Sequence, residues 1–204
     1  MGRSLVGMPD RFYRETVTCS LGGGPRNNAV PFDYTWGEWV DIDVAGEPTV
    51  MDNPWGAEDA LRLVEGTGNN PHGIFLPPTS NRLMVVGNQW YCFQVWARIQ
   101  ERDKVSVVPA LRFDVDASGA WFDLTYGVVG GVQSPALAQI LEGPNGWYLC
   151  QVTAKAISTG LAGLSLSIGL TGGYNEAYPG DGSSGVSLYY PMVCVVNPTY
   201  PFAI

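Results

Sequence analysis

The chain has 204 residues and a net charge of −8, and 46% of its residues are hydrophobic while only 15% are charged. This composition excludes a disordered chain, because enough apolar surface is present to build a core. The acidic balance and the few Lys and Arg residues argue against nucleic acid as a partner, since phosphate binding needs clustered positive charge. No apolar stretch is long enough to cross a bilayer, so no membrane partner is expected.

The N-terminal segment, residues 1–34, has no strand pattern and is rich in Gly, Pro, Asn and Arg, as in LGGGPRNNAVPFDY. It carries charges and lacks the apolar core of a signal peptide, so we expect a product made in the cytoplasm and used without secretion. We predict that this segment is an extended arm that orders on the surface of a partner. Residues 35–204 are then one domain.

Two short segments in the rest of the chain fit either a helix or a strand. NPWGAEDALRLVEG, residues 53–66, has acids early and Arg62 late, as in a helix, but residues 59–65 fit a strand equally well. SPALAQIL, residues 134–141, is a weaker helix candidate and also fits a strand. The pattern alone leaves both open, because tertiary context decides such cases.

From residue 83 onward, apolar and polar residues alternate as in strands with one buried face. In WYCFQVWARI, residues 90–99, this alternation places Trp90, Gln94, Trp96 and Arg98 on the face opposite the core. The residues expected to face the core are Tyr91, Phe93, Val95, Ala97 and Ile99.

Three later segments extend the same pattern. Residues 104–115 and 119–129 predict a hairpin, and LAGLSLSIGL, residues 161–170, predicts a further strand. The last segment, residues 185–196, is apolar on both faces, so we expect it to be covered on both sides; its Pro191 indicates an edge position or a bulge. The residues expected to share the buried side of these strands are Phe122, Leu124, Tyr126, Val128, Leu164, Leu166, Ile168 and Leu170.

One turn-into-strand motif, N-x-W-Y-x-x-Q-V, occurs twice, at residues 88–95 and 145–152. We interpret the two copies as equivalent strands in two different sheets, with the leading aromatic residues packing over the start of each strand. Short strands punctuated by Gly and Pro predict an all-β fold, a jelly-roll β-sandwich of two antiparallel sheets with an N-terminal extended arm.

The order of these motifs resembles the carbohydrate-binding-module-like jelly rolls of tailed-phage structural proteins. The resemblance covers about residues 35–200, and the segments that carry it are Ala60–Glu65, Tyr91–Arg98, Asn145–Val152 and Ser187–Val193. It implies a non-enzymatic virion protein, on the capsid or tail surface: a capsid decoration (cement) or head-fibre protein, or a small tail component. Its implied partners are the major capsid protein or another virion protein, and two further copies of itself in a homo-trimer.

In this interpretation the N-terminal segment attaches the protein to the assembled capsid, and binding to the lattice alone would stabilise that lattice. The candidate attachment residues are Arg3, Arg11, Phe12, Tyr13, Arg14 and Arg26. The alternative is a tail or fibre module that binds a host glycan during receptor adsorption. A third interpretation is a polysaccharide-degrading enzyme.

Few residues support catalysis, and no catalytic residue is assigned. The one histidine, His72, lies in GTGNNPHGIF without a motif around it, and we expect it on a surface loop. Carboxylates could form a glycosidase pair, but we interpret them as solvated surface acids. These carboxylates are Asp114, Asp116, Asp123, Glu142 and Asp181.

No cofactor is expected, although Asp114, Asp116 and Asp181 could supply oxygens to a calcium ion, as jelly rolls resembling this one often do. A structural zinc site is not expected, because the sequence has no C-x-x-C. The four cysteines are expected to be reduced and mostly buried; they are Cys19, Cys92, Cys150 and Cys194.

The candidate binding residues are aromatic side chains next to polar groups, an arrangement that suits either a glycan cleft or a subunit interface. Trp96 and Trp121 are expected on one partly polar face, and for a virion protein we favour the interface. The polar neighbours and the loop aromatics of this set are Gln94, Arg98, Asp123, Tyr174 and Tyr178. Trp90 and Trp147 are interpreted as strand-start packing residues.

Overall fold

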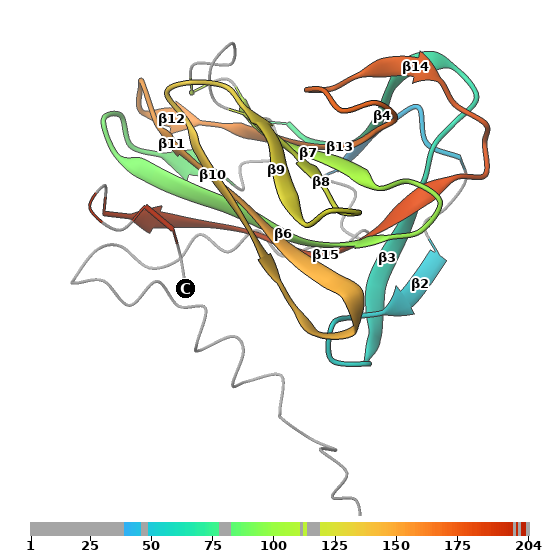
Figure 1. Ribbon diagram of the computed structural model, residues 1–204. Helices are drawn as coiled ribbons and strands as arrows, with labels where there is room; N and C mark the ends of the chain where they lie inside the picture. Colours follow the sequence, from blue (N-terminus) through green and yellow to red (C-terminus); the bar gives the residue numbers. More distant parts are fainter. Residues whose placement is uncertain are drawn as a thin grey trace, which may run out of the picture.

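The computed structural model describes residues 39–45, 49–77, 83–110, 112–113, 119–197, 199 and 201–202. These residues form two large antiparallel sheets that pack face to face (Figure 1). Within these ranges the only helical element is a 3-10 turn at Pro144–Gly146, and no helix there could cross a membrane. The expected arm, residues 1–34, and its attachment candidates lie outside the described residues.

The first sheet has seven strands in the order β1-β4-β13-β7-β8-β9, with β14 also paired to β4. Every pair of neighbours in it is antiparallel. Its strands are β1 (Val40–Ile42), β4 (Asn69–Leu76), β7 (Lys104–Ala110), β8 (Ala120–Asp123), β9 (Val128–Val132), β13 (Gly163–Gly169) and β14 (Ala177–Pro179).

The second sheet has six strands in the order β10-β11-β6-β15-β3-β2, and a separate two-stranded sheet joins β12 to β5. The six strands are β2 (Thr49–Asp52), β3 (Glu58–Val64), β6 (Trp90–Ile99), β10 (Leu137–Glu142), β11 (Trp147–Lys155) and β15 (Gly185–Val196). The short pair consists of β5 (Met84–Val85) and β12 (Gly160–Leu161).

Successive strands cross between the two large sheets. The chain passes from β3 in the six-stranded sheet to β4 in the other, back to β6, and across again to β7. The same crossing recurs from β11 through β13 to β15. Such alternation of two antiparallel sheets defines a jelly-roll sandwich, so the predicted fold class is confirmed.

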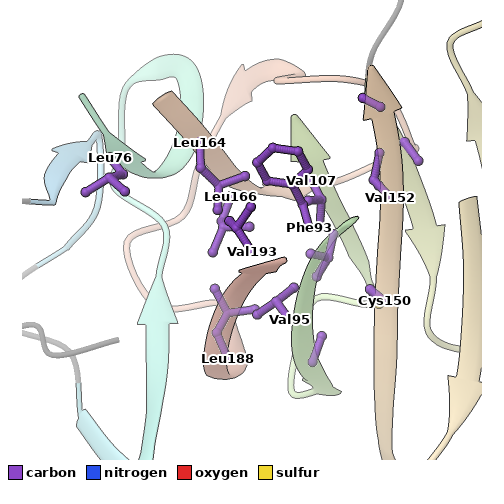
Figure 2. Packing of buried hydrophobic residues seen from close by; sticks show 14 of the residues in the cluster. Leu76, Phe93, Val95, Val107, Cys150, Val152, Leu164, Leu166, Leu188 and Val193 are labelled. Carbon is purple, nitrogen blue, oxygen red and sulfur yellow. The ribbon is translucent and has the colours of Figure 1, made fainter. Parts of the chain in front are cut away.

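The core lies between the sheets and is built from the inward residues of strands from both of them (Figure 2). Phe93 on β6 packs edge to face against Phe113, with ring centroids 5.1 Å apart. Leu164 and Leu166 on β13 face it from the other sheet, and all of these side chains are at most 1% exposed. Burying each such side chain stabilises the fold by about 1.5–3 kcal/mol. The two sheets pack face to face because this arrangement buries the apolar face of each.

The two copies of the repeated motif lie side by side in one sheet, which corrects their expected placement in two sheets. β6 and β11 are antiparallel neighbours, and Gln94 lies directly opposite Gln151. The Gln151 Nε2 donates a hydrogen bond of 2.7 Å to the Gln94 Oε1. In both motifs the side chains alternate between the core and the outer face in the same phase. When the two strands pair, their glutamines therefore lie on the same outer face.

The segments that the sequence left open are strands. Residues 58–64 form β3, and residues 137–142 form β10, which starts only after the turn at residues 134–136. Pro191 lies in β15, a central strand, next to an irregularity between Tyr189 and Met192 where Tyr190 has a φ of 50°. The bulge that Pro191 indicated is therefore present. The pairing of β15 with β3 covers only Gly185–Leu188, so Pro191 also lies beyond the part of β15 that is paired on both sides.

Strand ends account for the other differences from the expected core. Ile99 and Leu170 are 37% and 43% exposed, because β6 ends at Ile99 and β13 ends before Leu170. Tyr126 and Val128 are also exposed, because a turn follows β8 and shifts the alternation. Periodicity identifies the buried face of a strand but not the residue at which the strand stops.

The central packing predicts a large effect for Phe93→Ala. We expect this substitution to lower the free energy of unfolding by about 3–5 kcal/mol, because it removes the buried ring and leaves a cavity beside Phe113. Urea denaturation measures the loss. Tyr126→Ala, at a side chain that is 77% exposed, is the control and should change stability by less than about 0.5 kcal/mol; equal losses for the two variants would contradict the assigned core.

Candidate functional site

The outer face of the six-stranded sheet carries a cluster that we call the aromatic face, composed of Trp55, Trp96, Arg98, Trp147, Tyr189 and Tyr190. The alternation along β6 that buries Val95 and Ala97 in the core turns Trp96 and Arg98 outward. Strand register brings Tyr189 opposite Trp96 on one side and Trp147 opposite Arg98 on the other. The aromatic face is thus a direct product of strand pairing.

The rings contact one another edge to face. The Trp55 and Trp96 centroids lie 5.5 Å apart with an interplanar angle of 84°, and Tyr189 lies 5.9 Å from Trp55. The guanidinium carbon of Arg98 lies 4.9 Å from the centroid of the Trp147 ring. These cation–π and edge-to-face contacts fix the orientation of the side chains before anything binds.

A loop from residue 53 to residue 57 carries Trp55 to this face. The Asn53 Oδ1 accepts hydrogen bonds from the backbone N–H groups of Trp55 and Ala57, at 2.7 and 3.1 Å. The Asn145 side chain, from the turn before β11, donates a hydrogen bond of 2.9 Å to the Pro54 carbonyl oxygen. Asn145 has a φ of 57°, a left-handed conformation that asparagine tolerates well.

A row of three glutamines crosses three strands next to the rings. The Gln139 Nε2 donates to the Gln151 Oε1 at 2.5 Å, and the Gln151 Nε2 donates to the Gln94 Oε1 at 2.7 Å. Gln94 and Gln151 are buried, whereas Trp96, Arg98, Tyr189 and Tyr190 are half-buried and Trp55 is 37% exposed. The accessible part of the site is therefore its aromatic end.

Trp147 is fully buried, and its indole Nε1 is the one buried side-chain nitrogen or oxygen in the described part of the chain without a hydrogen-bond partner. The expected packing role of Trp147 agrees with this burial, but the ring packs on the outer face, under Arg98 and Tyr189, rather than over the core. The indole N–H is therefore buried beneath the aromatic face and is not part of its accessible surface.

The structure divides the expected binding residues between two faces. Trp96, Gln94 and Arg98 lie on β6, whereas Trp121 and Asp123 lie on β8 of the other sheet, so the expected single face is wrong. The Trp121 ring lies so close to Gly130 and Gly172 that a Cβ there would approach it to 2.0 and 2.6 Å. Tyr174 lies near the same place, with its hydroxyl 3.1 Å from where a Gly131 Cβ would be.

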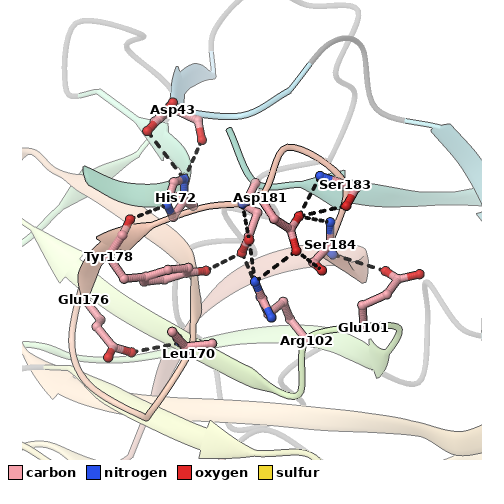
Figure 3. Close-up of polar contacts among 12 residues, drawn as sticks. Asp43, His72, Glu101, Arg102, Leu170, Glu176, Tyr178, Asp181, Ser183 and Ser184 are labelled. Carbon is pink, nitrogen blue, oxygen red and sulfur yellow. Dashed lines mark hydrogen bonds and ion pairs between the residues drawn. The ribbon is translucent and has the colours of Figure 1, made fainter. Parts of the chain in front are cut away.

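Tyr178 belongs to a third place, a buried charge cluster at one end of the sandwich (Figure 3). The Glu65 carboxylate is 0% exposed and accepts hydrogen bonds from the Arg102 guanidinium at 2.5 and 2.8 Å. It also accepts the Tyr178 hydroxyl at 2.7 Å and the Asp181 backbone N–H at 2.9 Å. Tyr178 is only 4% exposed, so its ring is not an open platform for a ligand.

Hydrogen bonding determines the ionisation of this cluster. Burial acts to raise the pKa of Glu65, but the bonds from Arg102, Tyr178 and the Asp181 N–H outweigh it and hold that pKa below the usual value. Burial, followed by the bond to Glu65, raises the pKa of Tyr178. The cluster connects the loop after β14 to the end of β3 and to the turn after β6. Its role is therefore structural.

His72 is fully buried on β4, so the expected surface loop is wrong. Its Nδ1 lies 2.7 Å from the Asp43 carbonyl oxygen, and its Nε2 lies 2.9 Å from the Tyr178 carbonyl oxygen. The ring therefore links the segment after β1 to β14 across β4 (Figure 3). Pattern reading missed this because the sequence NNPHGIF contains turn-forming residues although it builds a strand.

The carboxylates named from the sequence are dispersed. Asp123 pairs with Lys104 at 2.9 Å, and Asp181 accepts hydrogen bonds from Ser183, Ser184 and Arg102. Asp114 and Asp116 lie outside the described residues, and within the described ranges no group of three His, Cys, Asp or Glu residues is placed to hold a metal ion. Calcium binding stays a prediction.

Comparison with known proteins gives likenesses of low identity. No family model matches the sequence, and no curated protein matches it. Among solved structures, the chain is similar to the CBM22-1–GH10 modules of Clostridium thermocellum endo-1,4-beta-D-xylanase 10B complexed with xylohexaose, with 11% identity, a TM-score of 0.44, and coverage of 82% of this chain and 28% of that one.

Two further similarities are to single modules. The C-terminal family 22 carbohydrate-binding module of Clostridium thermocellum Xyn10B has 14% identity and a TM-score of 0.38, over 89% of this chain and 99% of that one. A xylan-binding domain from the same family has 17% identity and a TM-score of 0.35, over 80% of this chain and 90% of that one. The chain spans only 28% and 25% of the lengths of the xylanase and of a similar arabinofuranosidase.

The charge cluster predicts a specific acid sensitivity. Because the pKa of Glu65 is lowered on folding, its stabilisation is present above the unfolded value near 4.5 and is lost as the pH falls through the folded value. Glu65→Gln should weaken this acid dependence and cost about 3 kcal/mol at pH 7, since Arg102 loses its partner. Urea denaturation between about pH 7 and pH 3 measures both effects. The exposed Glu142→Gln serves as the control, and an acid dependence unchanged by Glu65→Gln would refute the assignment.

Proposed function

We propose that this chain is a non-catalytic glycan-binding module whose site is the aromatic face. The observation that carries the proposal is the row formed by Trp96 and Tyr189, directly opposite each other on β6 and β15, with the half-exposed Trp55 against both. Jelly-roll sheets offer such rows at a strand spacing of about 4.8 Å, so a ligand can lie across several strands.

The chemistry of the aromatic face suits a sugar. Aromatic rings bind the apolar C–H faces of a sugar ring, while amide and guanidinium groups bind its hydroxyls. Arg98 supplies charged donors next to the rings, and the ordered glutamine row ends beside them at Gln94. The existing contacts hold these side chains in place, which lowers the entropy lost on binding.

Glycoside hydrolysis needs a pair of carboxylates at the site. Among the described residues, the aromatic face has no such pair. Asp123 and Asp181 belong to ion pairs with Lys104 and Arg102 elsewhere in the fold. Binding without bond cleavage is therefore part of the proposal. We expect an oligosaccharide to bind reversibly and to remain uncleaved.

The test is a binding measurement with matched tryptophan variants. We expect Trp96→Ala to weaken binding of a glycan found on an array, or of xylohexaose, by about tenfold or more, because stacking area is lost. Trp121→Ala, on the other sheet, is the control and should bind as the unchanged protein does. Isothermal titration gives the affinities, and circular dichroism confirms that both variants are folded.

Two results would count against a glycan site on this face. One is the absence of binding to any glycan of a broad array by the folded, unchanged protein. The other is an equal loss of affinity in the Trp96 and Trp121 variants, which would locate the effect elsewhere.

A second candidate function is the virion role implied by the family resemblance. Aromatic rings together with Arg, as on the aromatic face, are also enriched at protein interfaces, and this favours a surface that contacts another virion protein. Attachment through residues 1–34 and assembly as a homo-trimer belong to this second proposal. The glycan-binding and virion roles are compatible, because a fibre or decoration protein can present a glycan site.

The virion role predicts that the full-length chain co-sediments with capsids assembled from the major capsid protein that is encoded next to it. Arg11→Ala combined with Arg14→Ala should reduce this association, because two charged contacts of the proposed attachment segment are removed. Trp96→Ala should leave it intact if attachment and glycan binding are separate. Undiminished co-sedimentation of the double Arg variant would remove the attachment role from these residues.

A further inference from the structure

Two cysteines face each other across the middle of the six-stranded sheet. Cys92 on β6 and Cys194 on β15 are direct partners in the antiparallel register. Both side chains leave the sheet on its outer side and pack in a small cluster with Val196, Trp90 and Phe202. Both are thiols, and the Cys194 S–H lies 3.8 Å from the Cys92 carbonyl oxygen, to which it donates a weak hydrogen bond.

The geometry of this pair meets the requirements of a disulfide. Directly opposite residues of antiparallel strands have Cα atoms about 4.5 or 5.5 Å apart, depending on the type of pair. A disulfide needs a Cα separation of about 4.4–6.8 Å and Cβ atoms on the same side. Side chains that alternate with period two and face each other satisfy the second condition, so no change of register is needed to join the two sulfurs.

We propose that Cys92 and Cys194 are a redox-responsive pair that closes into a cross-strand disulfide when the protein meets a small-molecule disulfide such as oxidised glutathione. The thiolate of one cysteine attacks the oxidant and releases one glutathione thiolate, which leaves a mixed disulfide. The thiolate of the second cysteine then attacks that bond and releases the second glutathione. The two protein thiols give up two protons and two electrons, and the oxidant becomes two molecules of reduced glutathione.

Phe202 covers the pair. Cys92 and Cys194 are 0% and 1% exposed, and Phe202 packs against them. Thr153, directly opposite Cys92 on β11, donates its hydroxyl hydrogen bond to the carbonyl oxygen of Pro201, the residue before Phe202. Oxidation therefore requires Phe202 to move aside, and the rate of oxidation reports how often the pair becomes accessible.

Closing the pair should stabilise the protein. The two residues are 102 positions apart, so the disulfide would close a long loop of the unfolded chain and reduce its conformational freedom. It would also join β6 and β15, the strands that carry Trp96 and Tyr189. We expect the melting temperature to rise by about 5–15 °C on oxidation and to return on reduction.

Cys150 provides an internal control. It lies on β11 with its side chain inside the core, opposite Val95 and Ile140, and no other cysteine is its strand partner. Burial raises the pKa of the Cys150 thiol, but Cys92 and Cys194 are buried as deeply, so what distinguishes Cys150 is that no cysteine lies opposite it. It should remain a thiol under conditions that oxidise the pair.

The experiment treats the full-length protein with oxidised glutathione and maps its peptides by mass spectrometry without reduction. The expected result is a linked peptide containing Cys92 and Cys194, an unmodified Cys150, and the rise in melting temperature, all reversed by dithiothreitol. Phe202→Ala should accelerate the linkage several-fold, and Cys194→Ala should abolish both the linkage and the rise in melting temperature.

Three results would overturn the proposal. They are the absence of a Cys92–Cys194 linkage in the folded protein and in Phe202→Ala, a linkage of either cysteine to Cys19 instead, and a linkage that leaves the melting temperature unchanged. Because the primary measurement uses the unaltered chain, it holds even if the Cys194→Ala variant fails to fold. It is also independent of glycan binding, so the two proposals can fail separately.

Discussion

The pairing of β6 with β11 on one side and β15 on the other determines most of what this protein presents to its surroundings. These three strands bury Phe93, Val95 and Val152 on their inner face and align Trp96, Tyr189 and Gln151 on their outer face. Because the side-chain period of a strand is two, a slip of one residue would exchange the two faces. The hydrophobic core thereby fixes the register, and the register in turn creates the aromatic face and the cysteine pair.

The two outer faces of the sandwich are built differently. On the seven-stranded sheet, glycines and serines make room for the loop after β13: Trp121 packs over Gly130, and the Asn175 side chain accepts hydrogen bonds from Ser165 and Ser167. On the six-stranded sheet, bulky rings and a guanidinium remain half-exposed. This difference is why we place the proposed ligand on the six-stranded sheet, although tryptophan occurs on both.

Polar residues inside the structure secure its loops rather than perform chemistry. Glu65 joins the turn at Arg102 to the stretch from Tyr178 to Asp181. His72 joins that same stretch, at the Tyr178 carbonyl, to Asp43. Burying such groups is unfavourable unless every one of them finds a partner, so each network specifies one loop arrangement.

Sequence patterns by themselves determined that the chain is an all-β sandwich and determined the faces of its longest strands, because alternation is a local property that survives in any context. They identified Trp96, Gln94 and Arg98 as outward residues for the same reason. Only the tertiary structure decided that the two copies of the repeated motif are neighbours, that Trp121 lies on the opposite sheet, and that His72 and Tyr178 are buried. Those outcomes depend on which strands pair and which loops cover them, and such contacts join residues far apart in the chain, where a local pattern carries no information.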